Sequence, residues 1–152
     1  MRRVSFEPGA EGNGHSLLRG IDHVGIAVRD LDAAIAFYSE TFGMQPVHTE
    51  VNHDQDVREA MLRVGESGPL LQLIAPLSEQ SPIAKFLETR GEGIHQIAYS
   101  VDDVDQVAET LRERGLQLLY ERARTGTGGS RVNFVHPKSA GGVLVELVEK
   151  PE

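Results

Sequence analysis

The chain has 152 residues, of which 39% are hydrophobic and 25% charged, enough for one domain with a buried core. The net charge of −8 argues against a nucleic-acid-binding protein, because neutralising phosphates needs a basic surface. The absence of cysteine excludes disulfides, thiolate metal ligands and a cysteine nucleophile. No apolar run approaches the roughly 20 residues that a membrane span needs.

The first segment of the chain, residues 1–18, has the composition of a tail. Arg2 and Arg3 are followed by no apolar stretch, and the segment runs through Pro8, Gly9, Gly12 and Gly14. We therefore expect a flexible N-terminal tail, not a signal peptide, and a cytoplasmic protein. Residues 19–152 are expected to form a single domain.

The segment 20–44, GIDHVGIAVRDLDAAIAFYSETFGM, begins as a short apolar strand and continues through an Asp-rich turn into an amphipathic helix. The apolar face of this helix consists of Leu31, Ala34, Ile35, Tyr38 and Phe42. Asp30 is the expected N-cap and Gly43 the expected C-terminal stop. Strands are expected next at 44–51, 57–64 and 70–75.

A further helix is expected at 81–90, because Ser81 and Pro82 have the composition of a helix start. The pattern of the first segment then returns at 93–116, GIHQIAYSVDDVDQVAETLRERGL. Its helix carries an apolar face made of Val104, Val107, Ala108 and Leu111, and its expected N-cap and stop are Asp103 and Gly115. Three more strands are expected, at 116–122, 131–136 and 142–149.

The order of elements is therefore βαβββ, a linking helix, and βαβββ again. Module 1 covers about 20–76, the linking helix about 81–90, and module 2 about 93–150. The repeat is too long and its copies too few for a solenoid. The sequence predicts an α+β fold in which two modules, related by a pseudo-two-fold axis, form one curled mixed sheet around a metal-binding cleft.

The repeat also identifies polar residues that point inward. Counting back equally from Val28 and Val101 pairs His23 with Gln96, and matching LLQLIA with LVELVE pairs Gln72 with Glu146. Gln72 and Glu146 each share a strand face with aliphatic side chains, where an unpaired polar group is costly to bury. Four such residues would converge on one point.

A shared divalent cation is the simplest partner for this set. One imidazole nitrogen, two amide oxygens and one carboxylate suit cobalt, manganese, magnesium or zinc. Taken alone, a strand histidine is more often a hydrogen-bonded structural residue, and a lone glutamine is more often solvated. His95 is the alternative to Gln96, but it lies one residue out of register and should point away unless a β-bulge intervenes.

Glu59 is a second candidate carboxylate. In VREAMLRV it alternates with Val57 and Met61, and the repeat pairs it with Asn133, so the position is acidic in one module alone. If Glu59 faces the cleft, two carboxylates flank a bound substrate. A solvated strand carboxylate is the other interpretation.

Several segments together resemble the methylmalonyl-CoA epimerase family of the vicinal oxygen chelate (glyoxalase-like) superfamily. They are IDHVGIAVRDLD, VREAML, the LQL strand, GIHQIAYSVDDVD, LRERGLQLLY, RVNFVHPKS and GVLVELVE. The likeness covers about residues 20–151. The strands of the IDHV type occur throughout the superfamily, whereas VREAM and HPKS at this spacing are more specific to the epimerases.

The resemblance implies an enzyme that interconverts the C2 epimers of methylmalonyl-CoA through a metal-stabilised enolate, and a homodimer. It makes His23, Gln72 and Glu146 metal ligands, with cobalt as the first candidate ion. The fourth ligand of the family is usually a histidine, whose place Gln96 takes here. Glu59 and Glu146 would be the acid–base pair. Glu146 as both ligand and base is awkward, because a coordinated carboxylate is a weaker base.

Two alternatives stay open. Another glyoxalase-like metal-dependent isomerase or lyase, acting on a thiol adduct, would share the fold and the metal. A metal-free protein that binds a small toxic molecule, as resistance members of the superfamily do, would favour an aromatic-lined groove. Aromatic residues make up 5% of this chain and tryptophan is absent.

Overall fold

A computed structural model of the chain describes residues 16–152. Most of the expected tail, residues 1–15, lies outside the described residues. Leu17 and Leu18 pack against a hydrophobic cluster of the second module, so the packed part of the chain begins slightly before residue 19.

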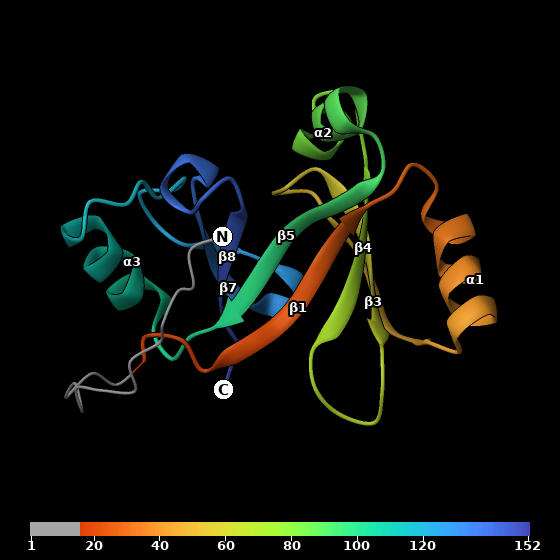
Figure 1. The fold of residues 1–152 in the computed structure, drawn as a ribbon, viewed down its shortest axis with the longest axis horizontal. Helices are drawn as coiled ribbons and strands as arrows, with labels where there is room; N and C mark the ends of the chain where they lie inside the picture. Colours follow the sequence, from red (N-terminus) through yellow and green to blue (C-terminus); the bar gives the residue numbers. More distant parts are fainter. Residues whose placement is uncertain (1–15) are drawn as a thin grey trace, which may run out of the picture.

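The structure is built on one eight-stranded mixed sheet (Figure 1). Its strands are β1 (Gly20–Ala27), β2 (Gln45–Asn52), β3 (Val57–Arg63), β4 (Leu70–Pro76), β5 (Gly93–Ser100), β6 (Arg124–Thr125), β7 (Arg131–Val135) and β8 (Leu144–Glu149). Their order across the sheet is β2-β3-β4-β1-β5-β8-β7-β6. Each module contributes one half, and the two halves meet where β1 pairs with β5 in antiparallel orientation. The predicted α+β fold is confirmed.

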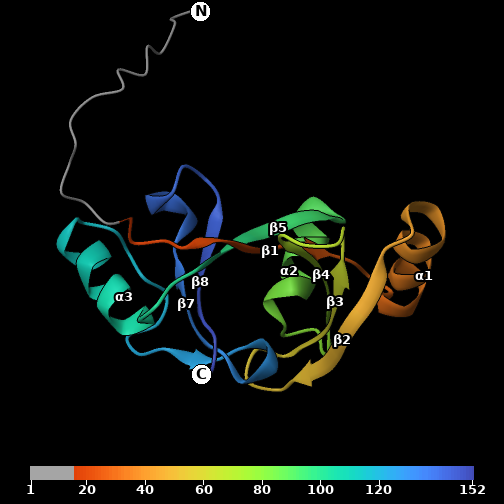
Figure 2. The same cartoon turned by 90° about the horizontal axis from the view of Figure 1, so that it is seen from below.

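The sheet curls strongly. Figure 2 shows it bending away from the β1–β5 pair on both sides, so that the two halves face a common space. The helices are α1 (Leu31–Phe42), α2 (Pro82–Arg90) and α3 (Val104–Glu113), with short 3-10 helices at Thr127–Gly129 and Pro137–Ser139. Figure 1 shows α1 and α3 on opposite flanks of the sheet.

The predicted helix ends are confirmed by hydrogen bonds and dihedral angles. Asp30 accepts from the amide of Ala33 at 3.0 Å, and Asp103 occupies the equivalent position in α3. Gly43 and Gly115 have φ values of 74° and 89°, a left-handed conformation that glycine adopts without strain. Among residues 16–152 no helix has both the length and the apolar character for crossing a membrane.

Each module has its own apolar core between a helix and the sheet. In module 1, α1 packs on β3 and β4 through residues that include Leu31, Leu62 and Leu73. In module 2, Val104 and Val107 of α3 pack with residues of β7 and β8. These two cores lie on the helix-covered side of the sheet, and the opposite, concave side carries buried polar residues together with apolar side chains such as Ile74 and Phe134. Phe42, predicted on the buried face of α1, is instead 61% exposed, because it lies in the last turn beyond the edge of this core.

The strand expected at 116–122 is wrong. This segment forms no regular strand and makes a single bridge to β7, from Leu118 to Val135. The amide side chain of Asn133 bonds both the N–H and the carbonyl of Tyr120, at 3.2 and 3.0 Å. Arg112 donates to the carbonyls of Tyr120 and Glu121. Side chains thus take backbone groups that a ladder would use, and the segment remains irregular.

Candidate active site and metal centre

The four predicted donors lie on the four central strands, one on each. They are His23 on β1, Gln72 on β4, Gln96 on β5 and Glu146 on β8. The strand register is symmetric around them. Gly25 lies opposite both Gln72 and Gln96, and Ala98 lies opposite both His23 and Glu146. His23 and Gln96, and likewise Gln72 and Glu146, therefore hold equivalent positions in the two halves of the sheet, as the repeat predicts.

Small residues on the paired central strands β1 and β5 leave space for the donors. A Cβ atom at Gly25 would lie 2.8 Å from Cγ of Gln96 and 3.0 Å from Oε1 of Gln72, too close for either to stay in place. The equivalent residue of module 2, Ala98, is fully buried. The centre thus depends on the absence of a side chain at residue 25.

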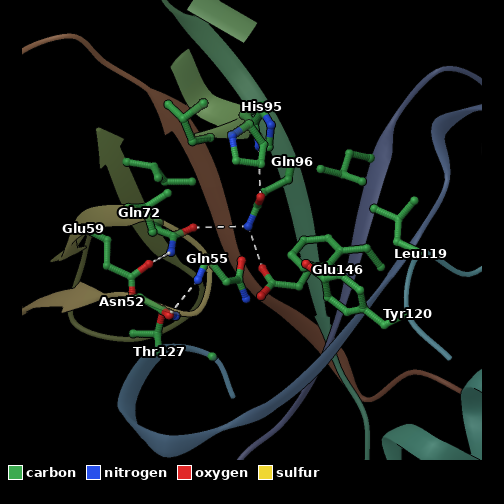
Figure 3. A pocket seen from close by; sticks show the side chains of 17 residues that line it. Asn52, Gln55, Glu59, Gln72, His95, Gln96, Leu119, Tyr120, Thr127 and Glu146 are labelled. Atoms are coloured by element: carbon green, nitrogen blue, oxygen red, sulfur yellow. Dashed lines mark hydrogen bonds between the residues drawn. The ribbon is translucent and has the colours of Figure 1, made fainter. Parts of the chain in front are cut away.

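His23 and Gln96 meet at one carboxylate oxygen of Glu146, and Gln72 joins them through Gln96. Oε2 of Glu146 accepts from Nε2 of Gln96 at 2.6 Å and from Nε2 of His23 at 3.0 Å. Nε2 of Gln96 also lies 3.3 Å from Oε1 of Gln72. None of the four residues is more than 5% exposed. Figure 3 shows the side chains of Gln72, Gln96 and Glu146 pointing toward one another.

Two β-bulges lie beside this centre, at equivalent places in β1 and β5. The register passes from Ile21↔Tyr99 to His23↔Ala98 and so skips Asp22; it passes from Gly25↔Gln96 to Ile26↔Ile94 and so skips His95. A bulge of this kind redirects the extra residue. The sequence predicts that His95 points away unless a β-bulge intervenes. The bulge is present, and His95 lines the cleft.

Both skipped residues hydrogen-bond to the donor that follows them. Oδ2 of Asp22 lies 2.7 Å from Nδ1 of His23, and Nδ1 of His95 lies 3.0 Å from Oε1 of Gln96. Asp22 was not among the residues predicted for the site. An Asp directly before a candidate ligand His was the available signal, because ligating histidines commonly donate their second N–H to a carboxylate.

The electrostatics of the centre favour a cation. Burial lowers the pKa of His23, but the carboxylates of Asp22 and Glu146 outweigh it and raise this pKa to about 9. Burial raises the pKa of Asp22, yet hydrogen bonds from His23 and Lys150 bring it down to about 2. The two carboxylates that flank His23 thus favour positive charge at the point where the donors meet.

The residues also fit a divalent ion by the chemistry of their donor atoms. A carboxylate oxygen, an imidazole nitrogen and two amide side chains converge within a buried site of negative charge. Within residues 16–152 no group of three or more His, Asp or Glu side chains has a metal-binding arrangement. The candidate set differs from such groups because two of its four members are amides.

Glu59 lies next to this centre and faces the cleft. It is 3% exposed, its Oε2 accepts from Nε2 of Gln72 at 2.8 Å, and its Oε1 accepts from the hydroxyl of Thr127. Burial raises the pKa of Glu59, and the nearby charge of Glu50 adds to this effect. The interpretation of Glu59 as a solvated strand carboxylate is wrong, because the strand turns it inward.

Thr127 belongs to a segment that sequence reasoning did not connect with the site. The loop 126–130 extends from module 2 to module 1, where the amide of Gly128 donates to Glu50 at 2.7 Å. Gly126 packs so tightly that a Cβ would lie 2.6 Å from Val132. The glycines at 126, 128 and 129 were the available signal, because glycine allows the backbone to approach other segments closely.

A cleft opens beside the four donors, and Gln72, Gln96 and Glu146 line it (Figure 3). Both carboxylates, Glu59 and Glu146, line it. Apolar side chains form the rest of its wall together with a few amides. These lining residues include Asn52, Gln55, Ile74, Ile83, Leu119, Tyr120, Phe134 and Leu144.

Comparisons with known proteins agree with this architecture. The profile of the Glyoxalase/Bleomycin resistance protein/Dioxygenase superfamily matches residues 22–134. The chain is 38% identical over 129 residues to the ethylmalonyl-CoA/methylmalonyl-CoA epimerase of Cereibacter sphaeroides, covering 84% of this chain and 95% of that protein.

Solved structures are similar as well. The crystal structure of methylmalonyl-CoA epimerase from Mycobacterium tuberculosis shares 55% identity and a TM-score of 0.88, covering 91% of this chain and 93% of that one. A variant of the Streptomyces coelicolor methylmalonyl-CoA epimerase, in complex with 2-nitronate-propionyl-CoA, shares 45% identity and a TM-score of 0.86. It covers 89% of this chain and 99% of that one.

Proposed function

The chain belongs to the methylmalonyl-CoA epimerases of the Glyoxalase/Bleomycin resistance protein/Dioxygenase superfamily, and we propose that it interconverts the C2 epimers of methylmalonyl-CoA. The observation that carries this proposal is a pair of buried carboxylates, Glu59 and Glu146, lining one cleft beside a four-donor centre. An epimerisation needs one group to remove a proton and another to return it to the opposite face.

The acid–base work falls to the two glutamates. The C2 hydrogen lies between a thioester carbonyl and a carboxylate, so its removal leaves charge that both groups share. Burial raises the pKa of Glu59, which makes its carboxylate a stronger base than an exposed one. Thr127 and Gln72 bond its two oxygens and hold the side chain toward the cleft.

Glu146 has a second oxygen for this task. Both hydrogen bonds that it accepts from the centre go to Oε2, which leaves Oε1 for the substrate. One carboxylate can therefore face the centre with one oxygen and exchange a proton through the other. This division eases the conflict between the roles of ligand and base.

We propose one divalent metal ion as the cofactor, in keeping with the metal dependence that is general among epimerases of this superfamily. The ion would be held by His23, Gln72, Gln96 and Glu146. When bound, it would supply positive charge that stabilises the enolate. Cobalt is our first candidate, with manganese, magnesium or zinc as alternatives. Gln96 is favoured over His95 as fourth donor, because His95 contacts the amide of Gln96 and not Glu146.

The direct test follows solvent deuterium into C2 of methylmalonyl-CoA. We expect incorporation that depends on added divalent metal, at the rate at which the epimers interconvert. Purified protein stripped with a chelator and then reloaded gives the comparison. No incorporation in the metal-loaded protein would overturn the proposed reaction while leaving the fold unaffected.

A homodimer is also proposed. Support comes from the convex side of the sheet, where β1 and β5 present three apolar cross-strand pairs, Ile21–Tyr99, Val24–Ile97 and Ile26–Ile94. Ile94 is 66% exposed and Ile21 is 47% exposed, unusual values for such side chains in a central pair of strands. We expect Ile94→Asp to shift the mass in solution from dimer to monomer. A cytoplasmic location stays a prediction.

A further inference from the structure

Three of the four donors of the proposed centre have a polar side chain behind them. The pairs are His23 with Asp22 at 2.7 Å, Gln72 with Glu59 at 2.8 Å, and Gln96 with His95 at 3.0 Å. A partner behind a donor decides which of its atoms faces forward. These three partners therefore determine what the centre offers to an ion.

Gln72 and Gln96 face the centre with different atoms. Gln72 presents its carbonyl oxygen, because its NH₂ group donates to Glu59. Gln96 presents its NH₂ group, which donates to Glu146 at 2.6 Å, while its oxygen faces His95. An amide NH₂ group has no lone pair to offer a cation. Gln96 is thus turned for a carboxylate partner and not for a metal.

We propose that His95 is a positioning residue that allows the Gln96 amide to turn over when a divalent cation binds. Turning the amide by half a rotation brings its oxygen to the centre and its NH₂ group to the imidazole. Nδ1 of His95, which now donates to that oxygen, must then accept. A neutral imidazole does this by losing the proton from Nδ1 to water and gaining one at Nε2, with no change of charge.

The surroundings of His95 suit such a change. Its ring packs edge-to-face on Phe86, with centroids 4.9 Å apart, so the ring can stay in place while its proton moves. The β-bulge fixes His95 behind Gln96 in either orientation. Asp22, at the equivalent bulge of β1, is an acceptor alone and holds His23 in one orientation. The two bulge residues thus differ, because His95 can change between donating and accepting a hydrogen bond whereas Asp22 can only accept one.

The first experiment measures Co²⁺ binding to the metal-free full chain by calorimetry; the inference rests on the proposed metal centre. His95→Phe keeps a ring against Phe86 but removes both nitrogens, and we expect about 10–100-fold weaker binding. His95→Gln supplies a donor and an acceptor, and we expect it to restore most of the affinity. His53→Phe, at an exposed histidine in the β2–β3 turn, is the matched control and should bind as wild type does.

The second experiment distinguishes turning from simple support. In ¹⁵N spectra of imidazole-labelled protein, Nδ1 of His95 should be protonated without metal and unprotonated with Zn²⁺, a diamagnetic ion. If wild type binds Zn²⁺ and the proton stays on Nδ1, the turning of Gln96 is wrong although the centre stands. Wild-type affinity in His95→Phe would overturn the inference in the same way. Absence of metal binding to wild type would overturn the proposed centre and the inference together.

Discussion

The two modules share a backbone plan but use one equivalent position in opposite ways. Glu59 of β3 and Asn133 of β7 are matched by the repeat, and both are buried. The Glu59 carboxylate faces the cleft, whereas the Asn133 amide is occupied by the backbone of Tyr120. The symmetry thus places the four proposed donors at equivalent positions, and the departure from it at Glu59 places a second proposed acid–base carboxylate beside Glu146.

The same asymmetry shapes the cleft. In module 1, β2 pairs with β3 along its whole length. In module 2 the corresponding segment, 116–122, is irregular, and Leu119 and Tyr120 from it line the cleft. The loop 126–130 then bonds to module 1 through Thr127 and Gly128. Both modules line the cleft, module 1 from regular strands and the β2–β3 turn, and module 2 partly from irregular segments.

The largest effect should come from removing the group that breaks the symmetry. Glu59→Ala should abolish interconversion of the C2 epimers, because a positioned general base contributes about 10²–10⁴-fold. Glu146→Ala should do the same, since the return of the proton requires the second carboxylate. Chiral analysis of methylmalonyl-CoA over time measures both. Near-wild-type rates in the two variants would exclude a two-base reaction.

The next largest effect compares the matched positions Gly25 and Ala98. Gly25→Ala places a Cβ 2.8 Å from Cγ of Gln96 and must displace a donor, so we expect a loss in kcat/KM on the order of 10²-fold. Ala98→Gly removes a methyl group without crowding the donors and should cost mainly stability, about 1 kcal/mol. Co²⁺ affinity, measured in parallel, should fall for the first variant alone. Equal affinities would mean that the centre tolerates the displacement.

Much of this architecture could be predicted, because it follows from local patterns. The caps at Asp30 and Asp103 depend on residues close in sequence. The equivalence of His23 and Gln96 depends on the repeat itself. The bulges at Asp22 and His95 could not, since a bulge exists only relative to the register of a partner strand. The absence of a strand at 116–122 could not be predicted for a related reason. The side chain of Asn133, on β7, bonds the backbone of Tyr120 in this segment, and that contact depends on the tertiary structure.

A smaller effect should separate stability from activity at the symmetric pair of Glu59 and Asn133. Asn133→Ala leaves the N–H of Tyr120 without its partner and the Tyr120 carbonyl with Arg112 as its remaining donor, which should lower the free energy of unfolding by about 1–3 kcal/mol. Glu59→Ala should cost less stability while losing activity. Urea denaturation of both variants measures this. If Asn133→Ala were as stable as wild type, the amide would not be what holds the 116–122 segment.

The smallest effect tests whether the two helices that share a plan are stabilised alike. Asp30 accepts from Ala33 N and Asp103 accepts from Gln106 N, both at 3.0 Å and both at exposed positions. Replacing either with Ala should therefore cost about 1 kcal/mol, and the double variant should show the sum, because the sites lie on opposite flanks. Asp→Asn at each position keeps an accepting oxygen and serves as the control. Thermal and urea unfolding measure the free energy of unfolding of the two Ala variants. A clear inequality between them would show that packing on the sheet, and not the cap, determines the stability of one helix. The two modules would then share a backbone plan without sharing the way in which their helices are stabilised.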